Sequence, residues 1–211
     1  MNNTWIIISI ATAVAIGAMS PGPSFVMVAR TAVASSRRAG LLAALGMGIG
    51  GMTFAIGALL GLHALLAAVP WLYLLVKILG GAYIAYLGLR IWRGALQPLS
   101  VSESSDAPRT ASAGRAFLLG LGTQLSNPKT AIVYASIFAA LLPRHIPTVL
   151  MLVLPVIVFA IEAGWYAAVA LALSSAGPRT AYLRYKAWID RTAGGVMLLL
   201  GAKLAVSASA S

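Results

Sequence analysis

Two short polar breaks interrupt the long apolar runs of this chain, and they constrain its fold more than any other feature. The first break is Ser20-Pro21-Gly22-Pro23-Ser24, and the second is Ser126-Asn127-Pro128-Lys129. Each lies near the middle of a run longer than the roughly 20 apolar residues that cross a bilayer. Non-helical backbone at membrane depth is tolerated only where protein or a water-filled cavity satisfies its polar groups. Paired breaks at matching places in two repeats indicate a transporter's central binding site.

Composition independently indicates a membrane protein. The 211 residues are 60% hydrophobic and 9% charged, whereas soluble domains are about 45–50% apolar and about 25% charged. The absence of cysteine excludes disulfides and thiolate metal sites. His63 and His145 are too few and too far apart for a metal cluster, so the sequence predicts no metal and no cofactor. The positive-inside rule explains the net charge of +11 better than nucleic-acid binding does.

The apolar runs predict an all-α, polytopic fold with six transmembrane helices in a single domain. We place the spans at residues 5–34, 40–67, 70–92, 115–142, 146–174 and 190–208. The first run is interpreted as a retained span rather than a cleaved leader. Ser and Pro enrich the segment from Gln97 to Ala113, which predicts a flexible aqueous loop. The domain then divides into repeat one (1–95), the loop (96–114) and repeat two (115–211).

The basic residues predict the orientation of the chain in the membrane. Only Arg144 belongs to a loop on the opposite side from the basic majority, and the positive-inside rule then places both termini outside the cytoplasm of a bacterial inner membrane. Eleven of the fifteen basic residues lie in or beside the loops that join spans 1–2, 3–4 and 5–6: Arg30, Arg37, Arg38, Arg90, Arg93, Arg109, Arg115, Arg179, Arg184, Lys186 and Arg191.

An internal repeat supports the division into two halves. Besides the two breaks, Phe54–Ala58 matches Phe159–Ala163, and Lys77–Arg90 resembles Arg191–Lys203. Three spans per repeat is an odd number, so the second half is inverted relative to the first, as in many transporters. We expect spans 1 and 4 to be broken and transport to proceed by rocking of one repeat against the other.

The breaks predict a cradle for a carboxylate. Pro21 and Pro23 lack amide donors, and Gly22 permits backbone shapes that other residues resist. New half-helices would begin near Ser24 and Thr130, where the first amides have no intrahelical partner and carry partial positive charge. In an inverted repeat these two starts would face each other. The alternative is that the prolines only kink helices for packing.

Two ionisable residues extend the predicted site, because a charge at the bilayer centre costs several kcal/mol and indicates function. Glu162 is the only acidic residue predicted deep in a span, and it would pair with a substrate ammonium or carry a proton. Lys129 would bind a carboxylate or pair with Glu162, unless its side chain extends to the interface. Lys77 is the other candidate charge partner of Glu162. The predicted substrate-binding set is Ser20, Pro21, Gly22, Pro23, Ser24, Asn127, Pro128, Lys129 and Glu162.

Two further groups of residues could serve helix packing, and the first of them could also line the site. Polar side chains beside the second break either line the site or join helices, and they are Thr123, Gln124, Ser126 and Asn127. Glycines on the second span are expected to allow close helix packing, and they are Gly46, Gly48, Gly50 and Gly51.

These motifs together resemble the LysE/RhtB translocator superfamily over nearly the whole chain. Ser20–Pro23 is similar to its first-helix Pro-Gly-Pro signature, and Arg37–Gly40 with the following glycines is similar to its next segment. Lys77–Gly88 and Asn127–Lys129 resemble its third-helix pattern and its second break. Glu162 stands where members often carry an acidic residue.

The resemblance implies export of amino acids or related metabolites, driven by the proton or ion gradient without ATP, as an antiporter and as a candidate homodimer. Relatives often carry Thr-Pro-Gly-Pro-Asn where this chain ends its motif with Ser24, so no particular amino acid is implied. Three alternatives stay open. They are an exporter of a cation or an organic acid, an integral-membrane enzyme, for which no nucleophile or metal constellation is present, and a non-transporting assembly partner.

Overall fold

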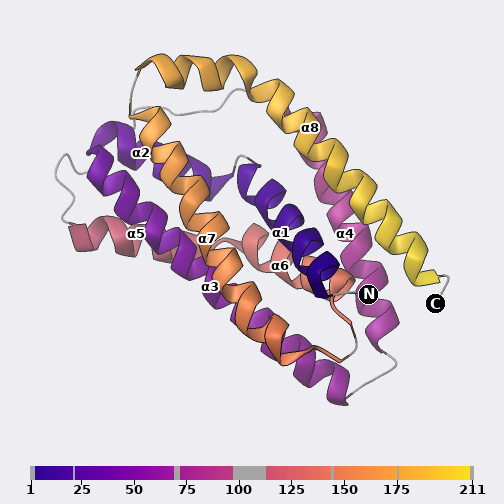
Figure 1. The fold of residues 1–211 in the computed structure, drawn as a ribbon. Helices are drawn as coiled ribbons and strands as arrows, with labels where there is room; N and C mark the ends of the chain where they lie inside the picture. The colour runs from indigo at the N-terminus through magenta and orange to yellow at the C-terminus, as the bar shows by residue number, and fades with distance from the viewer. Residues whose placement is uncertain are drawn as a thin grey trace.

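Helices make up nearly all of the part of the chain that the computed structural model describes, which is residues 3–20, 22–68, 72–96, 113–143, 145–174 and 176–209. Figure 1 shows them as one bundle. In chain order they are α1 (Asn3–Met19), α2 (Pro23–Ala34), α3 (Arg37–Ala68), α4 (Leu72–Gly94), α5 (Ala113–Leu125), α6 (Pro128–Leu141), α7 (Thr148–Leu173) and α8 (Ala176–Ser209).

Both predicted breaks coincide with helix boundaries. Helix α1 ends at Met19 and α2 begins at Pro23, with an angle of 59° between the two helix directions. Helix α5 ends at Leu125 and α6 begins at Pro128. Proline suits the first position of a helix because its missing N–H would have no intrahelical partner there. Gly22 has φ −165° and ψ −171°, an extended conformation open to any residue. The prediction that this turn needs a glycine's backbone freedom is therefore wrong.

The apolar helices are those of a membrane protein. By length and composition, two described helices can cross a bilayer singly: α3 over Arg37–Gly61, and α7. Helices α1 and α2 pass the same test together, as a bent pair that forms either a broken span or a re-entrant loop. The same criterion, applied to the described residues, does not identify α4 or α8 as spans.

The last helix begins earlier than the sequence predicts. It starts at Ala176 rather than near residue 190. Pro178 falls in its first turn, where proline is tolerated, and no glycine or proline interrupts residues 179–190. A basic, helix-compatible stretch thus extends the apolar span by about four turns. The start of α5 also differs slightly, since Ala113 and Gly114 are helical rather than part of the loop. Residues 97–112 of that loop lie outside the described part of the chain.

Helix pairs from different halves of the chain pack closely. Helix α3 lies against α5 and α7, and α4 lies against α6 and α8 (Figure 1). Glycines permit these contacts, as predicted. A Cβ on Gly48 would lie 2.7 Å from Ala163 Cβ, and one on Gly50 would lie 2.7 Å from Gln124 Cβ. A Cβ on Gly46 would overlap the backbone of α5.

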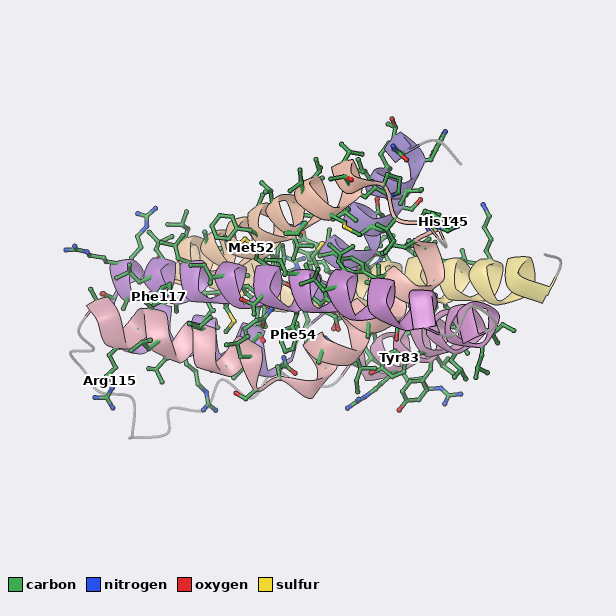
Figure 2. All side chains as sticks on the ribbon, turned by 90° about the horizontal axis from the view of Figure 1, so that it is seen from below. Met52, Phe54, Tyr83, Arg115, Phe117 and His145 are labelled. Atoms are coloured by element: carbon green, nitrogen blue, oxygen red, sulfur yellow. The ribbon has the colours of Figure 1, made fainter. Side chains whose placement is uncertain are left out.

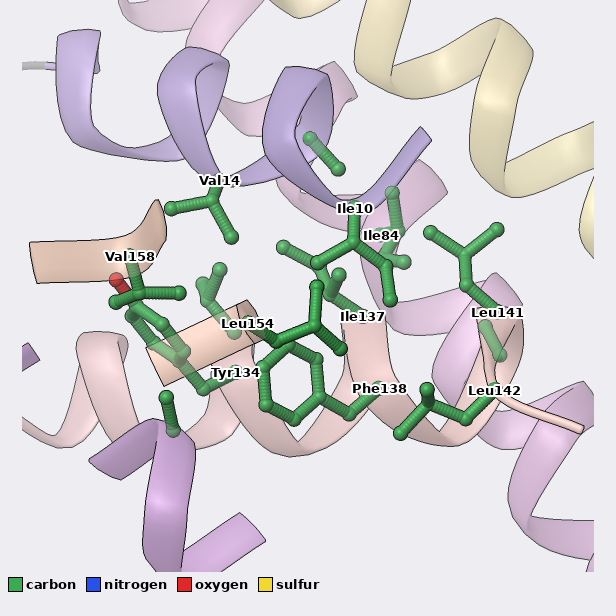
Figure 3. Packing of buried hydrophobic residues seen from close by; sticks show 14 of the residues in the cluster. Ile10, Val14, Ile84, Tyr134, Ile137, Phe138, Leu141, Leu142, Leu154 and Val158 are labelled. Atoms are coloured by element: carbon green, nitrogen blue, oxygen red, sulfur yellow. The ribbon is translucent and has the colours of Figure 1, made fainter. Parts of the chain in front are cut away.

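Two apolar cores occupy different parts of the bundle. The first joins α1, α3, α4, α6, α7 and α8, and Figure 3 shows Ile10, Phe138 and Leu154 at its centre. The second joins α2, α3 and α7 around Phe25 and Met47. Helix α7 contributes to both, with Val158 in the first and Tyr166 in the second. Glu162 lies one turn from each, so the two cores meet at a buried carboxyl group.

Candidate substrate site at the two breaks

A pocket lies where the two breaks meet, lined by residues of both breaks and of α1, α6 and α7. Its polar wall consists of Ser20, Ser24, Asn127, Lys129, Thr130 and Glu162. Its apolar wall consists of Val14, Gly17, Ala18 and Val133. Residues more than 100 positions apart in the sequence therefore share one small polar site.

Six of the predicted site residues line this pocket: Ser20, Gly22, Ser24, Asn127, Lys129 and Glu162. Pro23 and Pro128 are the first residues of α2 and α6. Pro21 lies outside the described residues. Lys77 lies on α4, and the prediction that its side chain pairs with Glu162 falls outside what the structure describes. The geometry brings the breaks together, and their role in binding stays a prediction.

Direct hydrogen bonds join one break to the other. Asn127 Nδ2 donates to Ser24 Oγ at 2.9 Å, and Lys129 Nζ donates to the Ser20 carbonyl oxygen at 3.1 Å. Ser24 Oγ in turn donates to Gln124 Oε1 at 2.8 Å. Each such bond contributes about 1 kcal/mol, and a bond from a charged donor contributes about 1.5–3 kcal/mol. These hydrogen bonds therefore fix how the first break packs against the second.

The start of α6 differs from the predicted carboxylate cradle. Asn127 Oδ1 accepts from the backbone N–H of Lys129 at 3.1 Å, which is an ordinary N-cap. The Asn127 carbonyl accepts from the N–H groups of Thr130 and Ala131 at 3.1 and 3.3 Å. These amides are already satisfied, so the expectation that they would hold a substrate carboxylate is wrong for this half. The Lys129 ammonium group is the cation that lines the pocket.

Glu162 is buried, with 3% of its surface exposed. Its Oε1 accepts a hydrogen bond of 2.8 Å from the Tyr134 hydroxyl. Its Oε2 has no hydrogen-bond partner among the described residues. Lys129 is the cation that acts on this carboxylate, but at longer range than a salt bridge. Within the described chain, the ion pair at contact distance is Lys186–Asp190, at 2.7 Å in α8.

Three site residues were missed or undervalued by sequence reasoning: Gln124, Tyr134 and Tyr166. Tyr134 bonds directly to Glu162, and Tyr166 lies one turn after it. Gln124 is 1% exposed and bonds to Ser24. The feature of the sequence that could have identified them is a hydroxyl or amide group inside an otherwise apolar span. Such groups also form hydrogen bonds that only hold helices together. Only the fold shows which role applies.

Opposite charges on one small pocket suit a ligand that carries both charges. Lys129 can bind a carboxylate, and the free Oε2 of Glu162 can accept from an ammonium group. Gly17, which has no side chain, and Ala18 form the wall beside these charges. Buried ionisable groups inside apolar helices, at a point where two pairs of consecutive helices meet, are typical of an integral-membrane translocator.

Comparison with known proteins identifies the family. The model for the LysE type translocator matches residues 15–208, and the chain belongs to this family. It is therefore a multi-pass membrane translocator and not an enzyme, as the sequence motifs indicated.

Relatives of similar length support the assignment. The chain is 35% identical to the threonine efflux protein of Escherichia coli (strain K12), over 90% of this chain and 92% of the relative. It is 34% identical to the threonine efflux protein of Salmonella typhi, with the same coverage. An uncharacterized membrane protein of Haemophilus influenzae is 30% identical, over 89% of this chain and 90% of that protein. No solved structure matches the chain.

Proposed function

We propose that this protein exports small neutral amino acids of the threonine type from the cytoplasm. The observation that carries the proposal is that one pocket presents both Lys129, from α6, and the unpaired Oε2 of Glu162, from α7, beside the first break. A zwitterion places its carboxylate at the lysine and its ammonium group at the glutamate. The names of the threonine efflux relatives support this substrate class.

The proton gradient drives export in this proposal, with Glu162 as the coupling group. An ammonium group and a proton compete for the same carboxylate, so the protein carries one or the other on each half-cycle. A proton that enters from outside displaces the substrate there and returns to the cytoplasm on Glu162. The outcome is antiport of amino acid and proton, with Tyr134 positioning the carboxylate through its 2.8 Å hydrogen bond.

The proposed architecture has six spans in an inverted repeat of three plus three, in the bacterial inner membrane, with spans 1 and 4 broken at the site. Two features support it. The first residues of α1 and the last of α8 lie at the same end of the bundle (Figure 1), as an even number of spans requires. Arg115 and His145, which flank the α5–α6 pair, lie at opposite ends (Figure 2). The excess of basic residues near Arg115 favours termini on the periplasmic side.

The decisive experiment is threonine efflux from proteoliposomes under an imposed pH gradient. We expect acidification on the side that receives the substrate to accelerate efflux by the unmodified protein. Glu162→Gln removes the proton-carrying group, so we expect the pH gradient to lose its effect. The control is Gly57→Ala, because a Cβ at Gly57 meets nothing within 4 Å. Gradient-driven efflux at the normal rate by the Glu162→Gln variant would refute the assignment.

Inhibition of threonine efflux by other solutes distinguishes export of amino acids from export of an organic acid or an inorganic cation. An organic acid has no ammonium group, so its efflux would not need the unpaired oxygen of Glu162. An inorganic cation would not need Lys129. We expect threonine efflux to be inhibited by neutral amino acids and unaffected by either alternative. Absence of any solute flux would instead favour a non-transporting assembly partner.

A further inference from the structure

Two buried polar atoms beside the pocket lack partners, and they are of opposite kinds. Gln124 Nε2 is a donor, and Glu162 Oε2 is an acceptor when the carboxyl is ionised. Neither completes a hydrogen bond to a described residue, although the Gln124 side chain is close enough to act on the Glu162 carboxylate. Buried polar groups are nearly always paired, so each such exception requires a physical explanation.

Helix α3 holds both side chains in place. A Cβ on Gly50 would lie 2.7 Å from Gln124 Cβ, and a Cβ on Gly51 would lie 2.9 Å from Glu162 Cγ. Two consecutive glycines thus receive the two stems, which leaves little room for the stems to move. The terminal amide is different, because rotation about the last torsion of glutamine is soft and roughly two-fold. Half a turn exchanges the oxygen and nitrogen without moving the rest of the side chain.

The hydrogen bonds fix which orientation suits which protonation state. With Glu162 ionised, Gln124 Nε2 faces an acceptor, and Gln124 Oε1 accepts from Ser24 at 2.8 Å as observed. With a proton on Oε2, Glu162 becomes a donor there, and an amide nitrogen cannot accept from it. Turning the amide presents Gln124 Oε1 to the protonated carboxyl. Gln124 Nε2 then donates to Ser24 Oγ, and the Ser24 hydroxyl turns its own hydrogen toward Tyr166, which lies within its reach.

We propose that Gln124 is a positioning residue that transmits the protonation state of Glu162 to the first break by turning its amide between these two hydrogen-bonding arrangements. The inference deepens, and rests on, the proposed role of Glu162 as proton carrier. The proton moves from water to Glu162 Oε2 and back. No other covalent bond forms or breaks, and the remaining changes are exchanges of hydrogen bonds. The result is that Ser24, 100 residues away from Gln124 in the sequence, changes from donating to Gln124 to accepting from it when Glu162 is protonated.

The other groups around Glu162 are less suited than Gln124 to transmit its protonation state to Ser24. Tyr134 and Lys129 face it from α6, and Tyr166 lies one turn along α7. Helix α3 contributes Gly51 at this contact. Tyr134 donates to Oε1, so it acts on the other carboxyl oxygen. Lys129 bonds to the Ser20 carbonyl rather than to Ser24. Gln124 connects the two groups directly, since its amide bonds to Ser24 and its side chain acts on the Glu162 carboxylate. Tyr166 also reaches Ser24, but Glu162 acts on it through charge alone.

The test is infrared difference spectroscopy of the protein in lipid bilayers, recorded between acidic and alkaline pH without substrate. We expect the band of the protonated Glu162 carboxyl to rise together with a change in one glutamine amide band. Glu162→Gln should abolish the paired change, and Gln124→Met should abolish its amide component. Gln97→Met is the matched control, since Gln97 is the other glutamine of the chain, and it should leave both bands unchanged. An amide band that ignores pH, or that still responds in Glu162→Gln, would overturn the proposal.

A transport measurement separates a relay from a merely structural role. Exchange of labelled for unlabelled threonine at equal pH needs the pocket but not net proton movement. We expect Gln124→Met to lower such exchange by about fivefold at most, the cost of its lost hydrogen bond to Ser24, while the acceleration by a pH gradient falls further, by about tenfold. Gln124→Glu, which preserves the shape, serves if the methionine variant does not fold. Equal loss of exchange and of gradient-driven flux would contradict a relay. Because the spectroscopic result needs no substrate, failure of the relay is distinguishable from failure of the proposed function.

Discussion

The two breaks differ in what holds them. The second is held from within, because Asn127 caps α6 with its own side chain and its own carbonyl. The first has no such cap, since Gly22 stands at the N-cap position of α2 without a side chain. It is held instead from the other half of the chain, by Lys129 at the Ser20 carbonyl and by Asn127 at Ser24.

This difference shows that apparently equivalent motifs carry unequal roles. The second break stabilises itself and also supplies the donors that the first break lacks. Loss of a second-break residue should therefore disturb both breaks, whereas a change in the first should stay local. Four substitutions test that ordering, all by efflux of labelled threonine from proteoliposomes.

We expect the largest effect from Lys129→Met. It removes the cation of the pocket and leaves the Ser20 carbonyl without its donor. Loss of a hydrogen bond from a charged group, about 1.5–3 kcal/mol, corresponds to a fall of about tenfold to a hundredfold in efflux. Lys203→Met is a suitable control because Lys203 is exposed on α8. Normal efflux from the Lys129 variant would remove the basis of the comparison.

Asn127→Ala should rank second. It removes the cap of α6, about 1 kcal/mol, and the donor to Ser24, about 1 kcal/mol. The two losses together, about 2 kcal/mol, correspond to a fall of up to about thirtyfold in efflux, and we also expect a lower midpoint of thermal unfolding in detergent. Ser126→Ala is the matched control, since the hydrogen bond described for the Ser126 hydroxyl goes to the Gly122 carbonyl of the preceding helix, α5, and not to the first break. Equal behaviour of the two variants would show that the cap has no special role.

Ser24→Ala should have a smaller effect. The substitution leaves α6 and its cap intact and removes the hydroxyl that Asn127 and Gln124 share. A loss of about 1 kcal/mol corresponds to about a fivefold decrease in efflux. Ser24→Thr retains a hydroxyl and should recover part of the activity. A greater loss than in Asn127→Ala would reverse the proposed order of the two breaks.

Gly22→Ala should have the smallest effect. Its backbone is extended, and a Cβ there would lie 3.5 Å from Lys129 Nζ, an ordinary contact. We expect efflux within about twofold of normal, since unconstrained sites usually shift free energies by less than about 0.5 kcal/mol. A severe loss would indicate that the first break adopts a different backbone conformation during transport.

The features that the sequence predicted well are local ones. Pro23 and Pro128 mark helix starts because proline fixes its own φ angle and lacks an N–H. The glycines of α3 predicted close packing because the absence of a side chain has the same consequence wherever helices meet. Glu162 and Lys129 stood out because charges inside apolar spans are costly. These arguments do not require knowing which distant residues each side chain contacts.

The features that it missed depend on contacts across the chain. Gln124 acquires its importance from Ser24, 100 residues earlier, and no local pattern indicates that pairing. Matching positions of the internal repeat also do not have matching environments. Gly57 aligns with Glu162, yet Gly57 is exposed and Glu162 is buried at the site. The start of α8 was missed because a charged helix can continue an apolar one without any break in hydrogen bonding.

The pairing of α4 with α8 has a consequence for how the protein opens. A Cβ on Gly88 would lie 2.5 Å from the Leu198 nitrogen and 2.6 Å from the Gly194 carbonyl oxygen, so the two backbones touch. At one end, Lys186 also donates to the Ala95 carbonyl oxygen at 3.3 Å. Sliding or parting these helices would break contacts along their length. We therefore expect α4 and α8 to move together during transport, as one body that contains segments from both halves of the sequence.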